Sequence, residues 1–196
     1  MLAPYSQACE NNKTFILPKL QRCFANKRHV LEIGSGTAQH AVFFSQHLPH
    51  VRWQCTDQAH YLDGIKAQIA ATKSPLPAPL ALDVTQPWPT MTPSIDAAFT
   101  ANTLHIMDEP MVQALWQGLG STMDNAADVV IYGPFRYHGR YTSQSNSEFD
   151  LWLKQRDSRS SIKEIDWVRA LAQTEGFELV SDEVMPANNQ LLHFRR

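Results

Sequence analysis

Short apolar runs alternate with longer segments of helical spacing along most of this chain. The apolar runs, which are typical of buried strands, are residues 29–33, 51–56, 79–84, 95–100, 128–132, 177–184 and 190–194. Apolar residues at helical spacing occupy residues 13–24, 38–48, 59–72, 111–123 and 162–174, and a further helix is expected around residues 149–153. Strands that alternate with helices predict a parallel sheet covered by helices on both faces.

The last two predicted strands lie too close together for a parallel connection. Only residues 185–189 join them, whereas a parallel crossover needs about a dozen residues or more. We therefore expect an antiparallel hairpin at the C-terminus. The pattern as a whole predicts a Rossmann-like α/β fold with a seven-stranded, mostly parallel sheet.

Composition is that of an ordinary globular chain. Its 196 residues, 43% hydrophobic and 18% charged, suit one domain, and no repeat or Gly/Ser linker divides them. The net charge of −2 gives no basic surplus, so a nucleic-acid partner is not expected. Because no signal pattern and no apolar run of about 20 residues is present, we expect no membrane association and a cytoplasmic location.

The three cysteines, Cys9, Cys23 and Cys55, are odd in number and form no C-x-x-C pair. This pattern argues against a disulfide framework and against a thiolate metal site. We expect reduced, mostly buried thiols, and no metal.

A glycine turn follows the first predicted strand, where residues 30–38 read Val-Leu-Glu-Ile-Gly-Ser-Gly-Thr-Ala. Gly34 and Gly36, with Ser35 between them, allow a tight turn and the close approach of a ligand to the start of a helix. A dinucleotide fingerprint needs a third glycine at position 39, which is Gln39 here. The turn therefore disfavours a nicotinamide-dependent oxidoreductase, although tight glycine turns also occur without a ligand.

Carboxylates follow the second and third predicted strands, at the edge of the sheet where ligands bind in open α/β folds. Asp57 is positioned to accept both hydroxyls of a ribose, but it could instead cap the next helix. Asp83 could accept the amino group of an adenine, with Val84 packed on the ring. The alternative for Asp83 is a turn before Thr85.

Two further polar residues, Asn102 and His105, follow the fourth predicted strand. Asn102 can donate or accept a hydrogen bond beside a bound cofactor, and His105 could reach the group that reacts. A lone histidine is more often structural, so we assign it no catalytic role from the sequence.

Glu32-Ile33-Gly34-Ser35-Gly36 resembles the first motif of class I methyltransferases that use S-adenosylmethionine (SAM). In that family the acidic residue orders the loop that receives the amino-acid half of SAM. The carboxylate of Glu32 could also pair with the ammonium group of SAM, directly or through water. The resemblance implies SAM as the cofactor, with Asp57, Asp83, Val84 and Asn102 in its site.

Over nearly its whole length the chain resembles the methyltransferase-like 26 family, a domain family of unknown function. The matching blocks are residues 8–13, 30–37, 101–106, 132–135, 142–146, 149–150 and 185–189. The resemblance implies one SAM-dependent methyltransferase domain over residues 1–196, with an N-terminal helical cap at residues 1–28. It does not identify the substrate.

Uncharged polar side chains from these blocks are candidates for a substrate pocket, namely Asn12, His105, Tyr132 and Asn146. They suit a small polar acceptor of the methyl group. No catalytic residue follows from the sequence, because SAM carries its own activated leaving group. Asn188 and Asn189 suit a turn better than a ligand contact.

Two other functions remain open alongside that of a methyltransferase. A non-catalytic module that binds SAM or S-adenosylhomocysteine would carry the same motifs. An NAD-dependent oxidoreductase is disfavoured by Gln39 and Asp83. A nucleic-acid methyltransferase is disfavoured by the near-neutral charge and by the absence of an Asn/Asp-Pro-Pro-Tyr block after the fourth strand.

Overall fold

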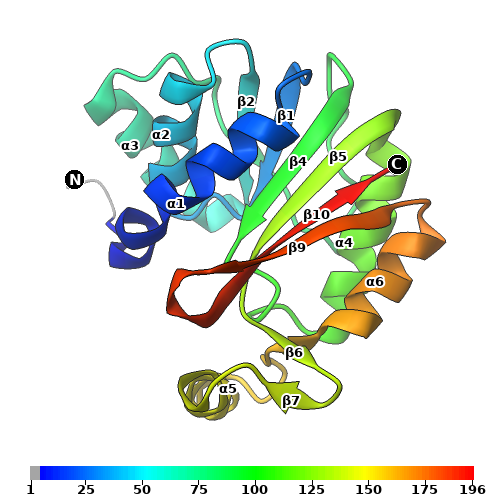
Figure 1. Ribbon diagram of the computed structural model, residues 1–196. Helices are drawn as coiled ribbons and strands as arrows, with labels where there is room; N and C mark the ends of the chain where they lie inside the picture. Colours follow the sequence, from blue (N-terminus) through cyan, green and yellow to red (C-terminus); the bar gives the residue numbers. More distant parts are fainter. Residues whose placement is uncertain (1–4) are drawn as a thin grey trace.

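The computed structural model describes residues 5–196, which form a seven-stranded sheet in the order β3-β2-β1-β4-β5-β10-β9 (Figure 1). The strands are β1 (His29–Ile33), β2 (Arg52–Asp57), β3 (Leu80–Ala81), β4 (Ile95–Ala101), β5 (Met123–Gly133), β9 (Glu178–Met185) and β10 (Asn189–Arg195). The pairs from β3 to β5 are parallel, whereas β10 runs antiparallel to both β5 and β9. The predicted α/β fold with a C-terminal hairpin is confirmed.

Helices cover both faces of this sheet (Figure 1). The helices are α1 (Gln7–Cys23), α2 (Gln39–His47), α3 (Leu62–Thr72), α4 (Glu109–Thr122), α5 (Gln144–Arg156) and α6 (Ile165–Thr174), of which all but α5 cover the sheet. The first three pack on one face and α4 and α6 on the other, so the buried apolar residues form two clusters with the sheet between them.

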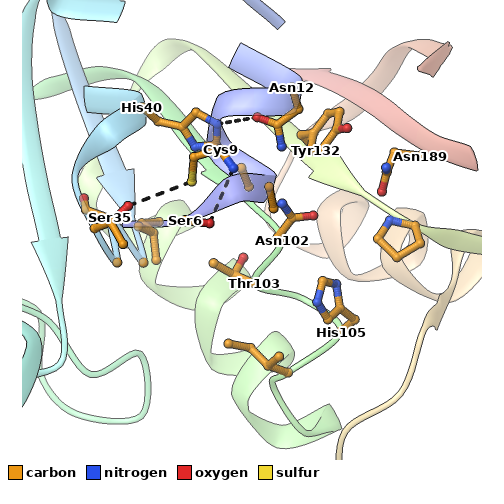
Figure 2. Close-up of a pocket in the computed structure, with 18 of the residues that line it drawn as sticks. Ser6, Cys9, Asn12, Ser35, His40, Asn102, Thr103, His105, Tyr132 and Asn189 are labelled. Carbon is orange, nitrogen blue, oxygen red and sulfur yellow. Dashed lines mark hydrogen bonds between the residues drawn. The ribbon is translucent and has the colours of Figure 1, made fainter. Parts of the chain in front are cut away.

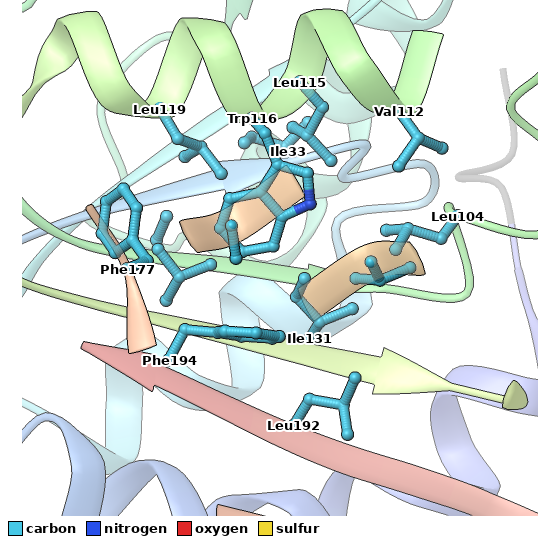
Figure 3. Close-up of a cluster of buried hydrophobic side chains, with 14 of the residues drawn as sticks. Ile33, Leu104, Val112, Leu115, Trp116, Leu119, Ile131, Phe177, Leu192 and Phe194 are labelled. Atoms are coloured by element: carbon cyan, nitrogen blue, oxygen red, sulfur yellow. The ribbon is translucent and has the colours of Figure 1, made fainter. Parts of the chain in front are cut away.

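Aromatic side chains form the centre of each cluster. On the face covered by α4 and α6, the Trp116 ring lies 4.9 Å from that of Phe194 and 5.8 Å from that of Phe177 (Figure 3). On the other face, the Phe44 ring lies 5.5 Å from that of Phe99 and 5.6 Å from that of Trp53. Such tilted and edge-on pairs stabilise a core beyond the burial of their apolar area.

A second, three-stranded sheet lies beyond the carboxyl end of β5 (Figure 1). Its strands are β6 (Phe135–Tyr137), β7 (Arg140–Tyr141) and β8 (Lys163–Glu164), and α5 lies between β7 and β8 in the chain. The pattern of apolar residues does not predict this sheet, because strands of two or three residues carry no measurable periodicity. The sheet places α5 beside the carboxyl ends of the main strands.

Several boundaries differ from those predicted. Helix α1 begins at Gln7 rather than at residue 13, because Ser6 caps it by accepting a hydrogen bond from the backbone N–H of Cys9. Pro18 lies inside α1 and does not end it. Strand β3 has only two residues where six were predicted. Residues 1–4 of the predicted N-terminal cap lie outside the described residues.

Candidate functional site

A cavity of about 870 Å³ runs along the carboxyl ends of β1 to β5 (Figure 2). Its walls come from these strand ends, from α1 and α5, and from the tip of the β9–β10 hairpin. The predicted site residues that line it are Asn12, Gly34, Ser35, Gly36, Asp57, Val84, Asn102, His105, Tyr132 and Asn146. Glu32 and Asp83 are the two predicted residues that do not line it.

The glycine turn leads from β1 to α2 and forms part of the cavity wall. Gly34 has a φ of +73°, and a Cβ there would lie 2.5 Å from Cγ2 of Thr103, so both the backbone and the packing require glycine. Gly36 also has a positive φ, of +54°, but a Cβ on it would meet no atom within 4 Å. The space beside Gly36 is open for a ligand.

Glu32 lies buried beneath this turn and acts on the site through the loop. Its Oε2 accepts hydrogen bonds from Ser35 Oγ at 2.8 Å and from Trp53 Nε1 at 3.2 Å. Burial raises the pKa of Glu32 to about 7, against these two hydrogen bonds, which lower it. Glu32 lies outside the cavity wall, so its pairing with the ammonium group of SAM, directly or through water, stays a prediction.

Asp57 ends β2 and holds the turn from the other side. Its Oδ2 accepts the backbone N–H of Gly36 at 2.7 Å, and its Oδ1 accepts that of Gln58 at the same distance. Burial raises the pKa of Asp57, while the two backbone hydrogen bonds lower it. Each oxygen keeps a further lone pair that can accept a hydroxyl group.

Asp83 forms a turn instead of lining the cavity. Its Oδ1 accepts hydrogen bonds from the backbone N–H of Thr85 at 3.0 Å and from Thr85 Oγ1 at 2.7 Å. The turn expected as the alternative is therefore present, and a contact of Asp83 with an adenine stays a prediction. Its neighbours Leu82 and Val84 supply apolar lining in its place.

The loop after β4 brings two side chains into the cavity. Asn102 has a φ of +59°, and its backbone N–H donates to Tyr132 O at 2.8 Å. His105 is 8% exposed and packs edge-on against Phe149, with ring centroids 5.1 Å apart. Burial, together with the positive charge of Lys163, lowers the pKa of His105 to about 4, so its imidazole is neutral at physiological pH.

Helix α1 contributes Asn12 to the cavity and pairs it with a residue that the sequence analysis missed. Asn12 Oδ1 lies 2.6 Å from Nε2 of His40, which must therefore be the protonated ring nitrogen. Burial lowers the pKa of His40 to about 4. Both residues line the cavity (Figure 2), and no sequence signal marks His40, because its burial depends on the packing of α1 against α2.

Tyr132 at the end of β5 and Asn146 on α5 line the cavity beside the hairpin tip. Burial raises the pKa of the Tyr132 hydroxyl, although the neighbouring Asn12 and Asn189 side chains lower it. Asn146 Nδ2 donates to the backbone oxygen of Asn188 at 2.9 Å, so α5 is joined to the hairpin. Asn188 has a φ of +58° and forms the predicted turn, while Asn189 also lines the cavity.

Cys9 is a further lining residue that the sequence analysis did not single out. It and Cys23 are only partly buried, which corrects the expectation of mostly buried thiols, whereas Cys55 is buried. Within residues 5–196 the thiols are free, and no group of three or more His, Cys, Asp or Glu side chains could hold a metal ion. No helix in that part of the chain is long and apolar enough to cross a membrane.

Several solved structures that resemble this fold are methyltransferases. Human N-acetylserotonin methyltransferase in complex with SAM matches with a TM-score of 0.80 at 12% identity, over 97% of this chain and 53% of that chain. The SAM-dependent methyltransferase SibL matches with a TM-score of 0.78 at 17% identity, over 96% and 55% of the two chains. An O-methyltransferase family protein from Burkholderia thailandensis gives 0.78 at 13% identity, over 95% and 57%.

These likenesses show a methyltransferase fold, and the chain spans about half the length of the structures it matches. A family model described as "Protein of unknown function (DUF938)" matches residues 3–196. That description does not mention the methyltransferase-like 26 family, so membership of the latter stays a prediction. The chain belongs to the DUF938 family.

Proposed function

We propose that this protein is a SAM-dependent methyltransferase that acts on a small polar acceptor. The observation that carries the proposal is the extent of the cavity across the carboxyl ends of β1 to β5. Gly36 and Asp57 lie toward one end of it, and Asn102 and His105 toward the other. A cofactor and an acceptor can therefore lie next to each other in one enclosure.

The lining residues fit the parts of SAM. Asp57 can accept the ribose hydroxyls, Leu82 and Val84 offer apolar contacts to the adenine, and the space beside Gly36 admits a ligand close to the backbone. Asn102 is available to the amino-acid part. Ligand pockets commonly measure roughly 300–1,000 Å³, and the volume of about 870 Å³ suits a cofactor with a small acceptor.

When bound, SAM supplies a methyl group whose bond to sulfur breaks as the acceptor atom bonds to carbon, with the electron pair left on sulfur. The protein aligns the two reactants and excludes water. His105 is placed to take the proton that the acceptor loses, because its neutral imidazole has a free lone pair inside the cavity; its lowered pKa makes it a weaker base than an ordinary histidine. His105 is thus the candidate catalytic residue.

The test is incubation of the protein with methyl-labelled SAM and a small-molecule extract of cells, followed by detection of labelled products. We expect a labelled product with the wild type, and about 100-fold slower labelling with His105→Gln. His138→Gln is the matched control, because the His138 side chain is 85% exposed. Tight binding of SAM without any labelled product would instead support the non-catalytic module.

A further inference from the structure

The acceptor end of the cavity, formed by the strand ends of β4 and β5 with α1, α5 and the hairpin tip, has a chemistry of its own. We propose that it takes an uncharged hydroxyl compound with a flat apolar body, in preference to a carboxylate, a phosphate or an ammonium compound. This inference rests on the proposed function and names the substrate class of that site.

The described residues that line the acceptor end carry no charge, and the positive charge that acts on His105 is that of the buried Lys163, outside the cavity wall. Among the lining residues that the structure describes, Asp57 is the one carboxylate, and there is no lysine or arginine. Asp57 belongs to β2, which β1 separates from β4 in the sheet. A charged acceptor would leave water without gaining an opposite charge from these lining residues, which disfavours its binding.

Hydrogen-bonding groups, in contrast, are available there. Asn12 and His105 are only 7% and 8% exposed. The two ring nitrogens of His105 make no hydrogen bond to any residue from 5 to 196, and the Asn12 side chain hydrogen-bonds to His40 and to the Tyr132 hydroxyl at the same end of the cavity. Buried polar groups are rarely left unpaired, so the imidazole of His105 is suited to an uncharged polar ligand.

The apolar body of the acceptor is inferred from Phe149. This residue of α5 lines the cavity, and its ring meets the His105 ring edge-on while it stacks on Trp152 at 5.7 Å. A flat molecule can pack beside Phe149 and present its hydroxyl to His105. A hydroxyl has a proton to give to the neutral imidazole, whereas an ionised carboxylate has none.

The experiment compares three one-ring probes, phenol, benzoate and benzylammonium, on the full chain loaded with S-adenosylhomocysteine. Calorimetry first measures the binding of S-adenosylhomocysteine itself, and failure at that step would contradict the proposed function. Ligand-observed NMR then ranks the three probes by their affinity for the loaded protein. We expect phenol to bind about ten-fold or more tightly than either charged probe.

Asn12→Asp places a carboxylate in the acceptor end and keeps an oxygen for the hydrogen bond from His40. We expect this variant to bind benzylammonium about ten-fold better relative to phenol than the wild type does. Asn125→Asp adds the same charge at an exposed position at the amino end of β5, and should leave the ranking unchanged.

The order of probe affinities in the wild type tests the inference even if Asn12→Asp fails to fold. Binding of benzoate or benzylammonium as tight as that of phenol, or no binding of phenol up to its solubility limit, would overturn the inference. So would a folded Asn12→Asp variant whose ranking matches that of Asn125→Asp.

Discussion

Gln39 Nε2 donates a hydrogen bond to Glu10 Oε1 at 2.6 Å, which joins α1 to the first turn of α2. Its Oε1 accepts the backbone N–H of Ser6 at 2.5 Å. Position 39 is where a dinucleotide-binding turn carries its third glycine. In this protein the same position holds a helix over the cavity, which explains why Asn12 and Cys9 can belong to the site.

Replacing Gln39 should therefore loosen α1 selectively. We expect Gln39→Ala to lower the free energy of unfolding by about 1–3 kcal/mol, because Glu10 Oε1 and the backbone N–H of Ser6 each lose a hydrogen bond. Amide hydrogen exchange in α1 should rise. Gln144→Ala is the matched control, since Gln144 also begins a helix but bonds only to Glu148 of its own helix at 2.9 Å. Unchanged exchange in α1 would speak against this role.

The two glycines of the turn should respond differently to alanine. Gly34→Ala should destabilise the fold by about 1–3 kcal/mol, because its Cβ meets Thr103 Cγ2 and its φ is positive. Thr103→Ser removes that methyl group, so the double variant should regain part of the loss. Gly36→Ala should retain more stability but weaken SAM binding. Urea unfolding and calorimetry separate these effects, and equal stability losses at both positions would contradict them.

Glu32 should make stability depend on pH. Its pKa is about 7 in the folded protein and roughly 4.3 in an unfolded chain, so folding favours the protonated form. The contribution is fully present below pH 4 and is lost as the pH rises through 7. Between pH 5 and pH 8, the wild type should therefore lose on the order of 2 kcal/mol relative to Glu32→Gln. Urea unfolding measures this difference. If both proteins change equally in unfolding free energy across this range, the raised pKa of Glu32 is refuted.

His105 should make stability depend on pH in the opposite direction from Glu32. Its pKa is about 4 in the folded protein, below the usual 6.5, so its contribution to stability is present above pH 6.5 and is lost as the pH falls toward 4. His105→Gln should consequently lose less stability than the wild type over that range, as measured by thermal unfolding. His138→Gln should follow the wild type. If His105→Gln follows it as well, the imidazole is not buried in its neutral form.

The fold was largely predictable from the sequence, because its strands and helices repeat a simple alternation and the hairpin follows from the five residues between its strands. What the pattern could not predict is β6 and β7, which have only three and two residues. The start of α1 was also missed, since the first turn of that helix carries no large apolar residue.

The site was predictable where a residue's role follows from its place after a strand, as for Gly36, Asp57 and Asn102. It was not predictable where tertiary contacts decide. The Asp83 side chain bonds to Thr85 in a local turn, and His40 enters the site because α1 packs over it. Both outcomes depend on distances in the folded protein, which the spacing of residues along the sequence does not reveal.

Calorimetric titration with SAM tests the central claim most directly, on the wild type, Asp57→Ala and Asp63→Ala. Asp57 lines the cavity, whereas the Asp63 side chain is 91% exposed on α3. We predict that the wild type and Asp63→Ala bind SAM equally, and that Asp57→Ala binds about 10- to 100-fold more weakly while it remains folded. No binding to the wild type, or equal binding by both variants, would contradict the account.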